Sequence, residues 1–425
     1  MTDTIFALSS GAPPAAIGVI RVSGPQAGFA LKALSAREFE PRLAKLAYLR
    51  DESGAILDQA LVLWFPGPNT ATGEDLAELH CHGGRAVVAA IERTLDRMDG
   101  VRRAEPGEFT RRAFANGRID LAEAEGLADL LSAETELQRG AAMAMAGGAF
   151  SAKVEEWRSR ILALSAQVEA VLDFDDEDDV SELPATFLET IADLHGELAD
   201  WLARPPAERL GEGYRIVLAG PPNAGKSTLF NALTESEAAI TSPIAGTTRD
   251  VIERSVAIKG IPFTFVDTAG LHEAHSDEIE KIGIDRAQQQ LARADLVLWL
   301  GASEAAPAGS WDIEAQIDSP DAETKPNPRF RVSAVSGEGM DAFRGAIVAE
   351  GRQAMPKPGE VALNKRQRLL VAEAVSALGD AGVHSDPLLV AENFRRVRIA
   401  FDRLIGRATT EDMLDALFGR FCIGK

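Results

Sequence analysis

Cysteine is nearly absent from this chain, since Cys81 and Cys422 are the only two among 425 residues. Two cysteines cannot form the disulfide framework of a small secreted domain, so we expect a reducing compartment. Long apolar runs are missing as well, because the most apolar window, residues 296–300, is far shorter than the roughly 20 residues that cross a bilayer. The first ten residues contain no Lys or Arg and do not resemble a secretory signal. The sequence therefore predicts a soluble cytoplasmic protein with no membrane partner.

Basic residues are also scarce. The chain has 44 Lys and Arg against 65 Asp and Glu, which gives a formal net charge of −21. This balance disfavours non-specific coating of nucleic acid, because phosphate binding requires clustered cations. Two local basic clusters, at 364–368 and 395–398, remain candidates for contacts with nucleic-acid phosphates, although solvated helix faces explain such clusters more often. The 46% of apolar residues excludes a disordered or fibrous chain.

The pattern of residue types divides the sequence into four stretches. Residues 1–118 mix short apolar strands with Gly and Pro, and residues 119–210 turn to Ala, Leu and Glu with helical spacing. Residues 211–345 alternate short β runs with helical segments, and helical texture returns over 346–425. This order is expected when one domain is inserted into another at a surface site. We therefore predict a multidomain α/β plus α protein, with an N-terminal α/β module and a helical domain that carries an inserted α/β domain.

Individual elements follow from hydrophobic spacing. The runs 17–22 and 60–65 predict strands of the first module. Leu414, Leu417 and Phe421 stand three and four residues apart, which indicates a helix near the C-terminus. The same spacing predicts one long helix through a stripe of six apolar residues: Val154, Trp157, Ile161, Leu164, Val168 and Val171.

The strongest motif lies at the start of the inserted domain. The apolar strand 214–219 runs into Gly220-Pro-Pro-Asn-Ala-Gly-Lys-Ser227, and a helical pattern follows. This is G-x-x-x-x-G-K-S between a strand and a helix, the context in which a glycine-rich loop encloses nucleotide phosphates. Lys226 would neutralise phosphate charge and Ser227 would offer a hydroxyl to Mg²⁺. The expected phosphate-binding residues are Asn223, Ala224, Gly225, Lys226, Ser227 and Thr228.

Two later segments match motifs that are expected at the same nucleotide-binding site. Ala245-Gly-Thr-Thr-Arg-Asp250 offers Thr248 as a second hydroxyl for Mg²⁺. The strand 261–266 leads into Asp267-Thr-Ala-Gly270, where Asp267 would hold the metal through water. Either segment alone is as often a simple turn, but three in this order predict a nucleotide-dependent switch. The nucleotide contacts expected from these segments are Ser242, Pro243, Ile244, Ala245, Gly246, Thr247, Thr248, Asp267, Thr268, Ala269 and Gly270.

A family resemblance becomes specific at this point. The three motifs in this order resemble the TRAFAC-class, translation-factor-like GTPases. The rest of the chain narrows the likeness through the segments 18–24, 72–84, 104–114 and the terminal Phe421-Cys-Ile-Gly-Lys425. With these segments, the whole chain resembles the MnmE (TrmE) family of tRNA-modification GTPases, among the TrmE-Era-EngA-like proteins.

The resemblance implies an activity and partners. It implies a K⁺-dependent GTPase that forms a homodimer through its N-terminal module and whose GTPase domains approach each other to hydrolyse GTP. Together with an MnmG (GidA)-type FAD protein, in a heterotetramer, such an enzyme adds a carboxymethylaminomethyl or aminomethyl group at C5 of the tRNA wobble uridine, U34. The implied cofactors are GTP, Mg²⁺, K⁺ and 5-formyl- or methylene-tetrahydrofolate.

The resemblance also implies roles in hydrolysis. Leu271 stands where Ras-like enzymes carry a catalytic Gln, so Glu280 is the residue implied to orient water. Without the resemblance, Glu280 would be as readily an exposed acid at a helix start. Ser227 and Thr248 are the implied Mg²⁺ ligands. The implied K⁺ ligands are Asn223, Ser242, Ile244 and Thr247.

A second site is implied in the N-terminal module, where the family binds a folate one-carbon donor. Its implied contacts here are Arg21, Glu78, Arg118 and Lys425, and Cys422 is implied to act at the modification site. By residue type alone, each charge would be an ordinary surface group and Cys422 a small packed residue. His80 and His82 would share a strand face opposite Cys81, and no further ligand cluster is visible, so we expect no metal there.

The sequence departs from the family at the guanine-reading N-K-x-D motif. The nearest segment, Ala315-Gln-Ile-Asp318, keeps only the aspartate, while Thr324-Lys-Pro-Asn327 has the lysine without the acid. Asp318 can still accept hydrogen bonds from the guanine N1 and N2 positions. Ser333 and Ala334 match the loop beside the base. Loss of the lysine predicts weaker binding or relaxed base selection.

Two alternatives compete with this interpretation. One is a ribosome-assembly GTPase of the Era or Der kind, which shares the three nucleotide motifs but not the N-terminal module or the C-I-G-K end. The other is a scaffold in which the eroded base motif leaves nucleotide binding weak and structural. Nucleotide affinity and turnover separate these cases.

Overall fold

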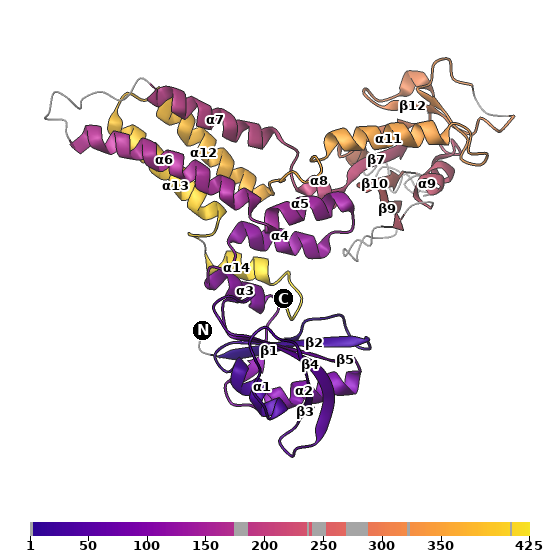
Figure 1. Ribbon diagram of the computed structural model, residues 1–425. Helices are drawn as coiled ribbons and strands as arrows, with labels where there is room; N and C mark the ends of the chain where they lie inside the picture. The colour runs from indigo at the N-terminus through magenta and orange to yellow at the C-terminus, as the bar shows by residue number, and fades with distance from the viewer. Residues whose placement is uncertain are drawn as a thin grey trace, which may run out of the picture. The chain divides into compact units, whose positions relative to one another are not determined.

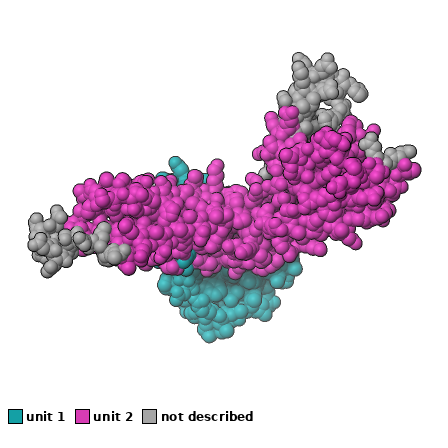
Figure 2. Space-filling model, turned by 90° about the horizontal axis from the view of Figure 1, so that it is seen from above, with its two compact units in different colours: residues 1–128, 151–155, 401–425 teal, residues 129–150, 156–400 magenta. Residues whose placement is uncertain are grey.

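The computed structural model describes most of the chain and resolves its elements (Figure 1). By packing it divides into two compact units, one of residues 1–128, 151–155 and 401–425, the other of residues 129–150 and 156–400 (Figure 2). Among the described residues, no helix combines the length and apolar character needed to cross a bilayer. The described residues are 3–173, 186–235, 238–239, 252–268, 288–320, 324–408 and 410–425.

The first unit is built on one mixed sheet with the strand order β3-β4-β5-β2-β1-β6. All neighbouring strands are antiparallel except β1 and β6. The helices α1 (Ala27–Ser35) and α2 (Arg85–Asp96) cover one face with an apolar core that includes Phe6, Ile20 and Val22. The strands are β1 (Thr4–Leu8), β2 (Ile17–Ser23), β3 (Lys45–Arg50), β4 (Ile56–Phe65), β5 (Leu76–His82) and β6 (Val101–Arg103).

The opposite face of this sheet receives α3 (Glu108–Ala115), which packs Phe109 against Ile5 and Ala7. The helix α14 (Glu411–Phe418) packs its Phe418 with Phe421 on residues of α3 and α4 (Leu121–Ser132). The sequence pattern predicted a helix through Phe421, whereas α14 ends at Phe418, about one turn earlier. Two backbone hydrogen bonds, from Arg420 to Leu417 and from Phe421 to Phe418, turn the chain after α14 and still bury Phe421.

Two glycines fix how the C-terminal segment lies on this unit. Gly107 has a φ of +71°, and a β-carbon there would overlap the backbone carbonyl of Phe418. Gly424 has a φ of +95°, and a β-carbon there would overlap the carbonyl of Leu8 at the end of β1. An isolated bridge between Pro106 and Ile423 lies between these contacts. Only a residue without a side chain permits such an approach of two backbones.

The second unit contains helices that precede and follow an α/β domain. Helix α6 (Ala149–Asp173) buries the predicted stripe from Val154 to Val168, each residue at most 2% exposed, while its last member, Val171, is half-buried. Helices α7 (Phe187–Ala203) and α12 (Lys365–Val383) pack together, with Gly382 beside Ile191. They lie beside α6 and α13 (Pro387–Leu404), as Figure 1 shows. The chain thus leaves the helical domain after α7 and returns at α12, which confirms the predicted insertion.

The inserted domain has an open sheet of strand order β13-β12-β11-β7-β10-β9-β8. The strands from β13 to β10 are parallel, and β9 and β8 are added antiparallel. Helices α8 (Glu208–Glu212), α9 (Lys226–Thr234) and α11 (Met340–Ala354) accompany it. Because carboxyl ends of parallel strands share one edge, loops following them gather there. The strands are β7 (Tyr214–Ala219), β8 (Ala238–Ala239), β9 (Ile252–Ile258), β10 (Ile261–Asp267), β11 (Leu296–Trp299), β12 (Trp311–Glu314) and β13 (Phe330–Arg331).

Candidate functional site

The phosphate loop begins where β7 ends and closes at the first turn of α9. Gly220 has a φ of +150°, and a β-carbon there would lie 3.0 Å from the backbone nitrogen of Gly301. Asn223 and Gly225 have φ values of +64° and +87°. These left-handed turns suit Gly and Asn and are strained for most other residues. The loop therefore brings backbone N–H groups to the N-terminus of α9, where the helix dipole favours an anion.

Lys226 lies inside this loop. The residue is 3% exposed, and its Nζ donates hydrogen bonds to the carbonyls of Gly220 at 3.0 Å and Pro221 at 2.7 Å. Burial lowers the pKa of Lys226 from its ordinary value, an effect that the charge of Asp267 opposes. The ammonium is thus held by two neutral carbonyls, which phosphate oxygens can replace with a stronger charge-assisted contact.

Ser227 and Asp267 meet beside the loop. Ser227 Oγ donates a 2.6 Å hydrogen bond to Asp267 Oδ2, and Asp267 is fully buried at the end of β10. Thr268 follows it and is held by its hydroxyl, which donates to the carbonyl of Leu218 at 2.8 Å. A hydroxyl beside a carboxylate, both oxygen donors, is the ligand chemistry that Mg²⁺ prefers. These two residues fit a magnesium ion between the loop and β10.

A hollow of about 200 Å³ adjoins the same loop. Gly225 and Thr228 line it from the loop and α9, and Asp318 and Ala334 line it from the loops after β12 and β13. Ser333 is buried, and its Oγ accepts hydrogen bonds from the backbone N–H groups of Val335 and Ser336 at 3.2 and 2.9 Å. The structure therefore brings Thr228, Asp318 and Ala334, predicted separately, to one concave surface.

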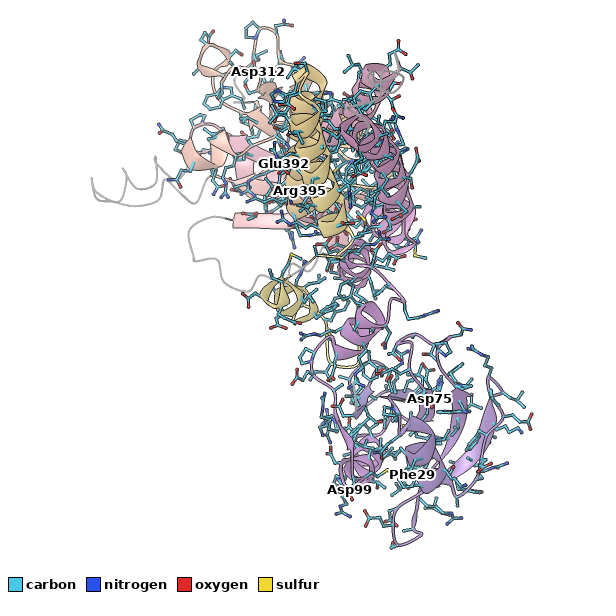
Figure 3. The ribbon with its side chains drawn as sticks, turned by 90° about the vertical axis from the view of Figure 1, so that its left-hand side faces the viewer. Phe29, Asp75, Asp99, Asp312, Glu392 and Arg395 are labelled. Atoms are coloured by element: carbon cyan, nitrogen blue, oxygen red, sulfur yellow. The ribbon has the colours of Figure 1, made fainter. Side chains whose placement is uncertain are left out.

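Strand β12 carries Asp318 to this place, and the sequence analysis did not identify it. It is only four residues long, and the buried acid Glu314 interrupts its apolar pattern. The alternation of Trp311 and Ile313 is the one signal that indicates it. In the other base-loop candidate, 324–327, Lys325 Nζ pairs with Asp312, labelled in Figure 3, and donates to the carbonyl of Trp299 at 3.3 Å.

Several predicted residues lie outside the described part of the chain. They include the proposed ligands of K⁺ other than Asn223, the second hydroxyl for Mg²⁺ and the candidate catalytic acid. These residues are Ser242, Pro243, Ile244, Ala245, Gly246, Thr247, Thr248, Ala269, Gly270 and Glu280.

In the first unit, Arg21 and Glu78 face each other across β2 and β5. Arg21 Nη2 and Nε donate to Glu78 Oε1 at 2.9 and 3.2 Å, and His80 Nε2 lies 3.2 Å from Glu78 Oε2. Burial alone would raise the pKa of Glu78, but the hydrogen bond and charge of Arg21, helped by His80, hold it below its ordinary value. The Arg21 guanidinium lies over the ring of Phe109, 5.9 Å from its centroid. Two residues predicted as separate ligand contacts thus form one charged cluster.

The other residues predicted for this site lie on neighbouring segments. Arg118 is exposed, and its Cγ would lie 3.2 Å from a β-carbon on Gly73. Cys422 is exposed, and its carbonyl accepts a hydrogen bond from the Lys425 N–H at 3.2 Å. Gly424 packs on Leu8, the residue after the partner of Arg21 in β1. The C-terminal segment therefore approaches the strand next to the Arg21 cluster.

A buried ionic network supports this face, and sequence reasoning missed it. Arg112 is fully buried and donates to carboxylates of Asp3 at 3.0 Å, Glu108 at 3.0 Å and Glu74 at 3.1 Å. Glu74 in turn accepts a 2.9 Å hydrogen bond from Ser23, two residues along β2 from Arg21. The segments 72–84 and 104–114, noted for their likeness to a family, supply Glu74, Glu108 and Arg112 of this network. Their charges anchor α3 on the sheet.

Histidines and basic clusters have local partners. His82 Nδ1 lies 2.7 Å from Asp58 Oδ1, and among the described residues no group of three or more His, Cys, Asp or Glu could hold a metal. Arg368 donates to the carbonyls of Leu202 and Arg204 at the end of α7, at 2.6 and 3.0 Å. Arg395 pairs with Glu392 one turn away on α13 (Figure 3). Arg368 thus joins α12 to the end of α7, whereas Arg395 pairs within its own helix, α13.

Comparison with known proteins covers the whole chain. Residues 4–118 match the family described as GTP-binding protein TrmE N-terminus, and residues 121–422 match the MnmE helical domain. A protein of Erythrobacter litoralis described as tRNA modification GTPase MnmE is 63% identical over 423 residues, which cover 100% of both chains. One of the same description from Novosphingobium aromaticivorans is 60% identical over 437 residues, again 100% of both. Among solved structures, the G domain of the T. maritima FeoB iron transporter is 25% identical over 32% of this chain and 97% of that chain, with a TM-score of 0.23.

Proposed function

Because the chain belongs to the MnmE family of tRNA modification GTPases, we propose that it binds and hydrolyses GTP at the loop 220–227 and uses this cycle to modify tRNA. One observation carries the nucleotide part of the proposal. Lys226, Ser227 and Asp267 converge at the carboxyl ends of two adjacent parallel strands, β7 and β10. That convergence supplies a buried cation, a hydroxyl ligand and a carboxylate beside it at a helix N-terminus, as phosphoryl chemistry requires.

The proposed roles follow from these positions. Lys226 exchanges its two carbonyl partners for phosphate oxygens, and backbone N–H groups of the loop donate to the same phosphates. Ser227 and Thr248 would hold Mg²⁺, which supplies positive charge to the phosphates when bound. Asp267 orients Ser227 through their hydrogen bond. Asp318 accepts hydrogen bonds from the N–H groups on the edge of guanine at the hollow beside the loop.

The proposal extends to a potassium ion and a water-orienting acid. Asn223 would hold K⁺ together with Ser242, Ile244 and Thr247, and its exposed side chain on a left-handed turn suits such a role. Glu280 would orient the attacking water, because Leu271 has no polar group to do so.

In the first unit we propose a folate site around Arg21, Glu78, Arg118 and Lys425. Arg21 uses Nε and Nη2 on Glu78, which leaves Nη1 to donate to a folate carboxylate. The lowered pKa of Glu78 keeps it ionised, so it can accept hydrogen bonds from pterin N–H groups. The molecule bound there would be 5-formyl- or methylene-tetrahydrofolate, which supplies the carbon that is added to the tRNA.

We assign the modification itself to the tRNA wobble uridine. Cys422, exposed on the segment that approaches the Arg21 cluster, would act where C5 of U34 receives its carboxymethylaminomethyl or aminomethyl group. An MnmG-type FAD protein would be the partner, in a heterotetramer. Both cysteines are unpaired, which suits a reducing cytoplasm.

We propose a separate role for each domain of the chain. Residues 1–118 would bind folate and dimerise, 211–345 would hydrolyse GTP, and the helical parts 119–210 and 346–425 would connect them. An apolar face supports the dimer: Leu46 and Leu61 are paired across β3 and β4 and are 61% and 36% exposed, and Tyr48 lies two residues further on β3.

Nucleotide turnover by the purified chain tests the central proposal. GTP, ATP and XTP are compared in matched KCl and NaCl buffers, and we expect hydrolysis of GTP alone, faster with K⁺. Turnover without base preference would remove Asp318 as a base reader. Absence of turnover in both salts would favour the scaffold alternative.

The tRNA part has a separate test. Full-length chain, an MnmG-type flavoprotein and unmodified tRNA are incubated with GTP and a tetrahydrofolate, and U34 is analysed by mass spectrometry. A new aminomethyl-type mass on U34 is expected. GTP hydrolysis without any change to U34, together with binding to ribosomal particles, would favour a ribosome-assembly GTPase instead.

A further inference from the structure

His80 lies beside the pair of Arg21 and Glu78, on the sheet face opposite α1 and α2. Its Nε2 is 3.2 Å from Glu78 Oε2, while Arg21 donates to Oε1 from Nε and Nη2 at 3.2 and 2.9 Å. An ionised carboxylate only accepts hydrogen bonds, so Nε2 of His80 must carry the hydrogen. The carboxylate of Glu78 is therefore held at both oxygens, by a different residue at each.

These contacts restrict the orientation of Glu78. A carboxylate offers about four acceptor positions, of which Arg21 fills two and His80 fills one. A ligand N–H that donates to Glu78 thus meets an acceptor whose direction is already fixed, which lowers the entropy cost of binding. The side chains of Glu78 and His80 are 18% and 28% exposed, so both remain open to a ligand on this face.

His80 can also change its charge without losing this contact. Nε2 keeps its hydrogen when a second proton enters the ring at Nδ1, so the hydrogen bond to Glu78 persists in both states. Histidine side chains ordinarily change charge between about pH 5 and pH 8. Protonation of His80 therefore adds a positive charge close to that of Arg21.

The charges that face His80 come from two strands. Glu78 and His82 lie two residues away on β5 itself, and Arg21 lies diagonally across on β2. Helix α3 presents the ring of Phe109 to Arg21 and adds no charge at that contact. The residues directly opposite His80 on the neighbouring strands are apolar: Val19 on β2 and Leu61 on β4. A charge on His80 therefore acts mainly on Glu78, Arg21 and a ligand bound beside them.

Resting on the proposed folate site, we propose that His80 is a positioning residue for folate binding. It holds the carboxylate of Glu78 so that its remaining acceptor position is directed for the pterin, and in its protonated form it attracts the anionic ligand more strongly. Folate binding by this chain then tightens as the pH falls from about 8 to about 6. The carboxylates of the ligand stay ionised over that range, so the change comes from the protein.

Calorimetric titration of the full-length chain with 5-formyl-tetrahydrofolate at several pH values tests this inference. For the unaltered chain, the dissociation constant should fall about twofold to fivefold from about pH 8 to about pH 6, as expected for one partly exposed charge. His80→Gln keeps an N–H donor but does not titrate. It should bind as the unaltered chain does at the higher pH and lose the dependence on pH. His80→Ala should weaken binding about threefold to tenfold at the higher pH, because the donor to Glu78 is gone.

His82→Gln is the matched control. His82 is a histidine on the same strand face, but its Nδ1 lies 2.7 Å from Asp58 Oδ1 and its side chain is 74% exposed. This variant should keep both the affinity and the pH dependence of the unaltered chain.

Four results would overturn the role of His80. The unaltered chain could bind folate equally at each pH, or His80→Gln could retain the pH dependence or bind more weakly at the higher pH. His80→Ala could bind as tightly as the unaltered chain, or His82→Gln could abolish the pH dependence. Failure of the unaltered chain to bind any tetrahydrofolate would instead contradict the proposed folate site itself.

Discussion

The hydroxyl of Ser227 donates to the buried carboxylate of Asp267 across 2.6 Å, which joins the start of α9 to the end of β10. The two residues stand forty positions apart in the sequence. Their hydrogen bond places the Ser227 hydroxyl, a predicted Mg²⁺ ligand, beside the carboxylate that is predicted to hold the metal through water. This preorganisation reduces the rearrangement that metal binding requires.

Removing the hydroxyl should reduce catalysis. Ser227→Ala leaves the loop backbone intact but takes away one oxygen ligand, so GTP turnover at limiting Mg²⁺ should fall at least about tenfold. Ser227→Thr keeps a hydroxyl and serves as the control. Titration of turnover against Mg²⁺ measures the effect, and an alanine variant with the Mg²⁺ dependence of the unaltered chain would contradict the role of Ser227.

The response to K⁺ should depend on the side chain of Asn223 and not on its backbone. Asn223→Gly removes the amide but adopts a φ of +64° without strain, so the loop keeps its shape. We expect the ratio of turnover in KCl to turnover in NaCl to fall toward unity. Asn223→Asp, which also tolerates left-handed backbone and keeps an oxygen ligand, is the control. An unchanged ratio in the glycine variant would assign K⁺ to other residues.

Gly107 should be required for docking of the C-terminal segment. Gly107→Ala introduces a left-handed alanine and a clash with the Phe418 carbonyl, so unit 1 should lose about 3 kcal/mol. Gly117→Ala is matched, since its φ is +64° but nothing lies within 4 Å of the new carbon. It should cost only about 1 kcal/mol. Urea unfolding and hydrogen exchange in α14 measure the loss of stability in each variant. Equal losses would mean that the left-handed backbone alone, and not the clash with Phe418, destabilises the Gly107 variant.

Acid should weaken the first unit through Glu108. Burial alone would raise the pKa of Glu108, but hydrogen bonds from Arg102, the Glu105 N–H and Arg112 outweigh it and hold the pKa below 4.5. The folded carboxylate therefore binds a proton less readily than the unfolded one. Its stabilising contribution is complete above about pH 4.5 and is lost as the pH falls through the lower, folded pKa.

Urea titrations from neutral pH to about pH 3 measure this dependence. Glu108→Gln should lower stability at neutral pH and flatten the decline in acid. An unchanged decline in that variant would assign the acid sensitivity to other carboxylates, of which Asp3 also has a lowered pKa in the same network.

Local patterns predicted a large part of this fold. The strand 214–219 has the predicted bounds, and the stripe on α6 is buried as expected because helical spacing is a property of neighbouring residues. The strand expected at 60–65 begins earlier, at Ile56. The sequence pattern did not indicate this start, because Leu57, Asp58 and Gln59 mix apolar and polar residues without clear alternation. The start of the phosphate loop was equally clear, since its glycines determine its backbone.

Contacts between distant residues were harder to predict. Arg21 and Glu78 pair across 57 positions, and nothing in either segment alone indicates the other. Gln316 touches Gly225 only because β12, a four-residue strand, sets the loop beside α9. Such contacts depend on strand order and register, which local sequence patterns leave undetermined.

The position of Gly424 on Leu8 has a consequence for how the protein is made. Strand β1 ends at Leu8, yet the backbone that closes over its end belongs to Gly424, which is translated long afterwards. At about 5–20 residues per second, the first sheet waits roughly tens of seconds for that cover. The inserted domain, translated in one uninterrupted stretch, has time to fold during that interval. The sheet that is translated before the inserted domain is thus completed after it.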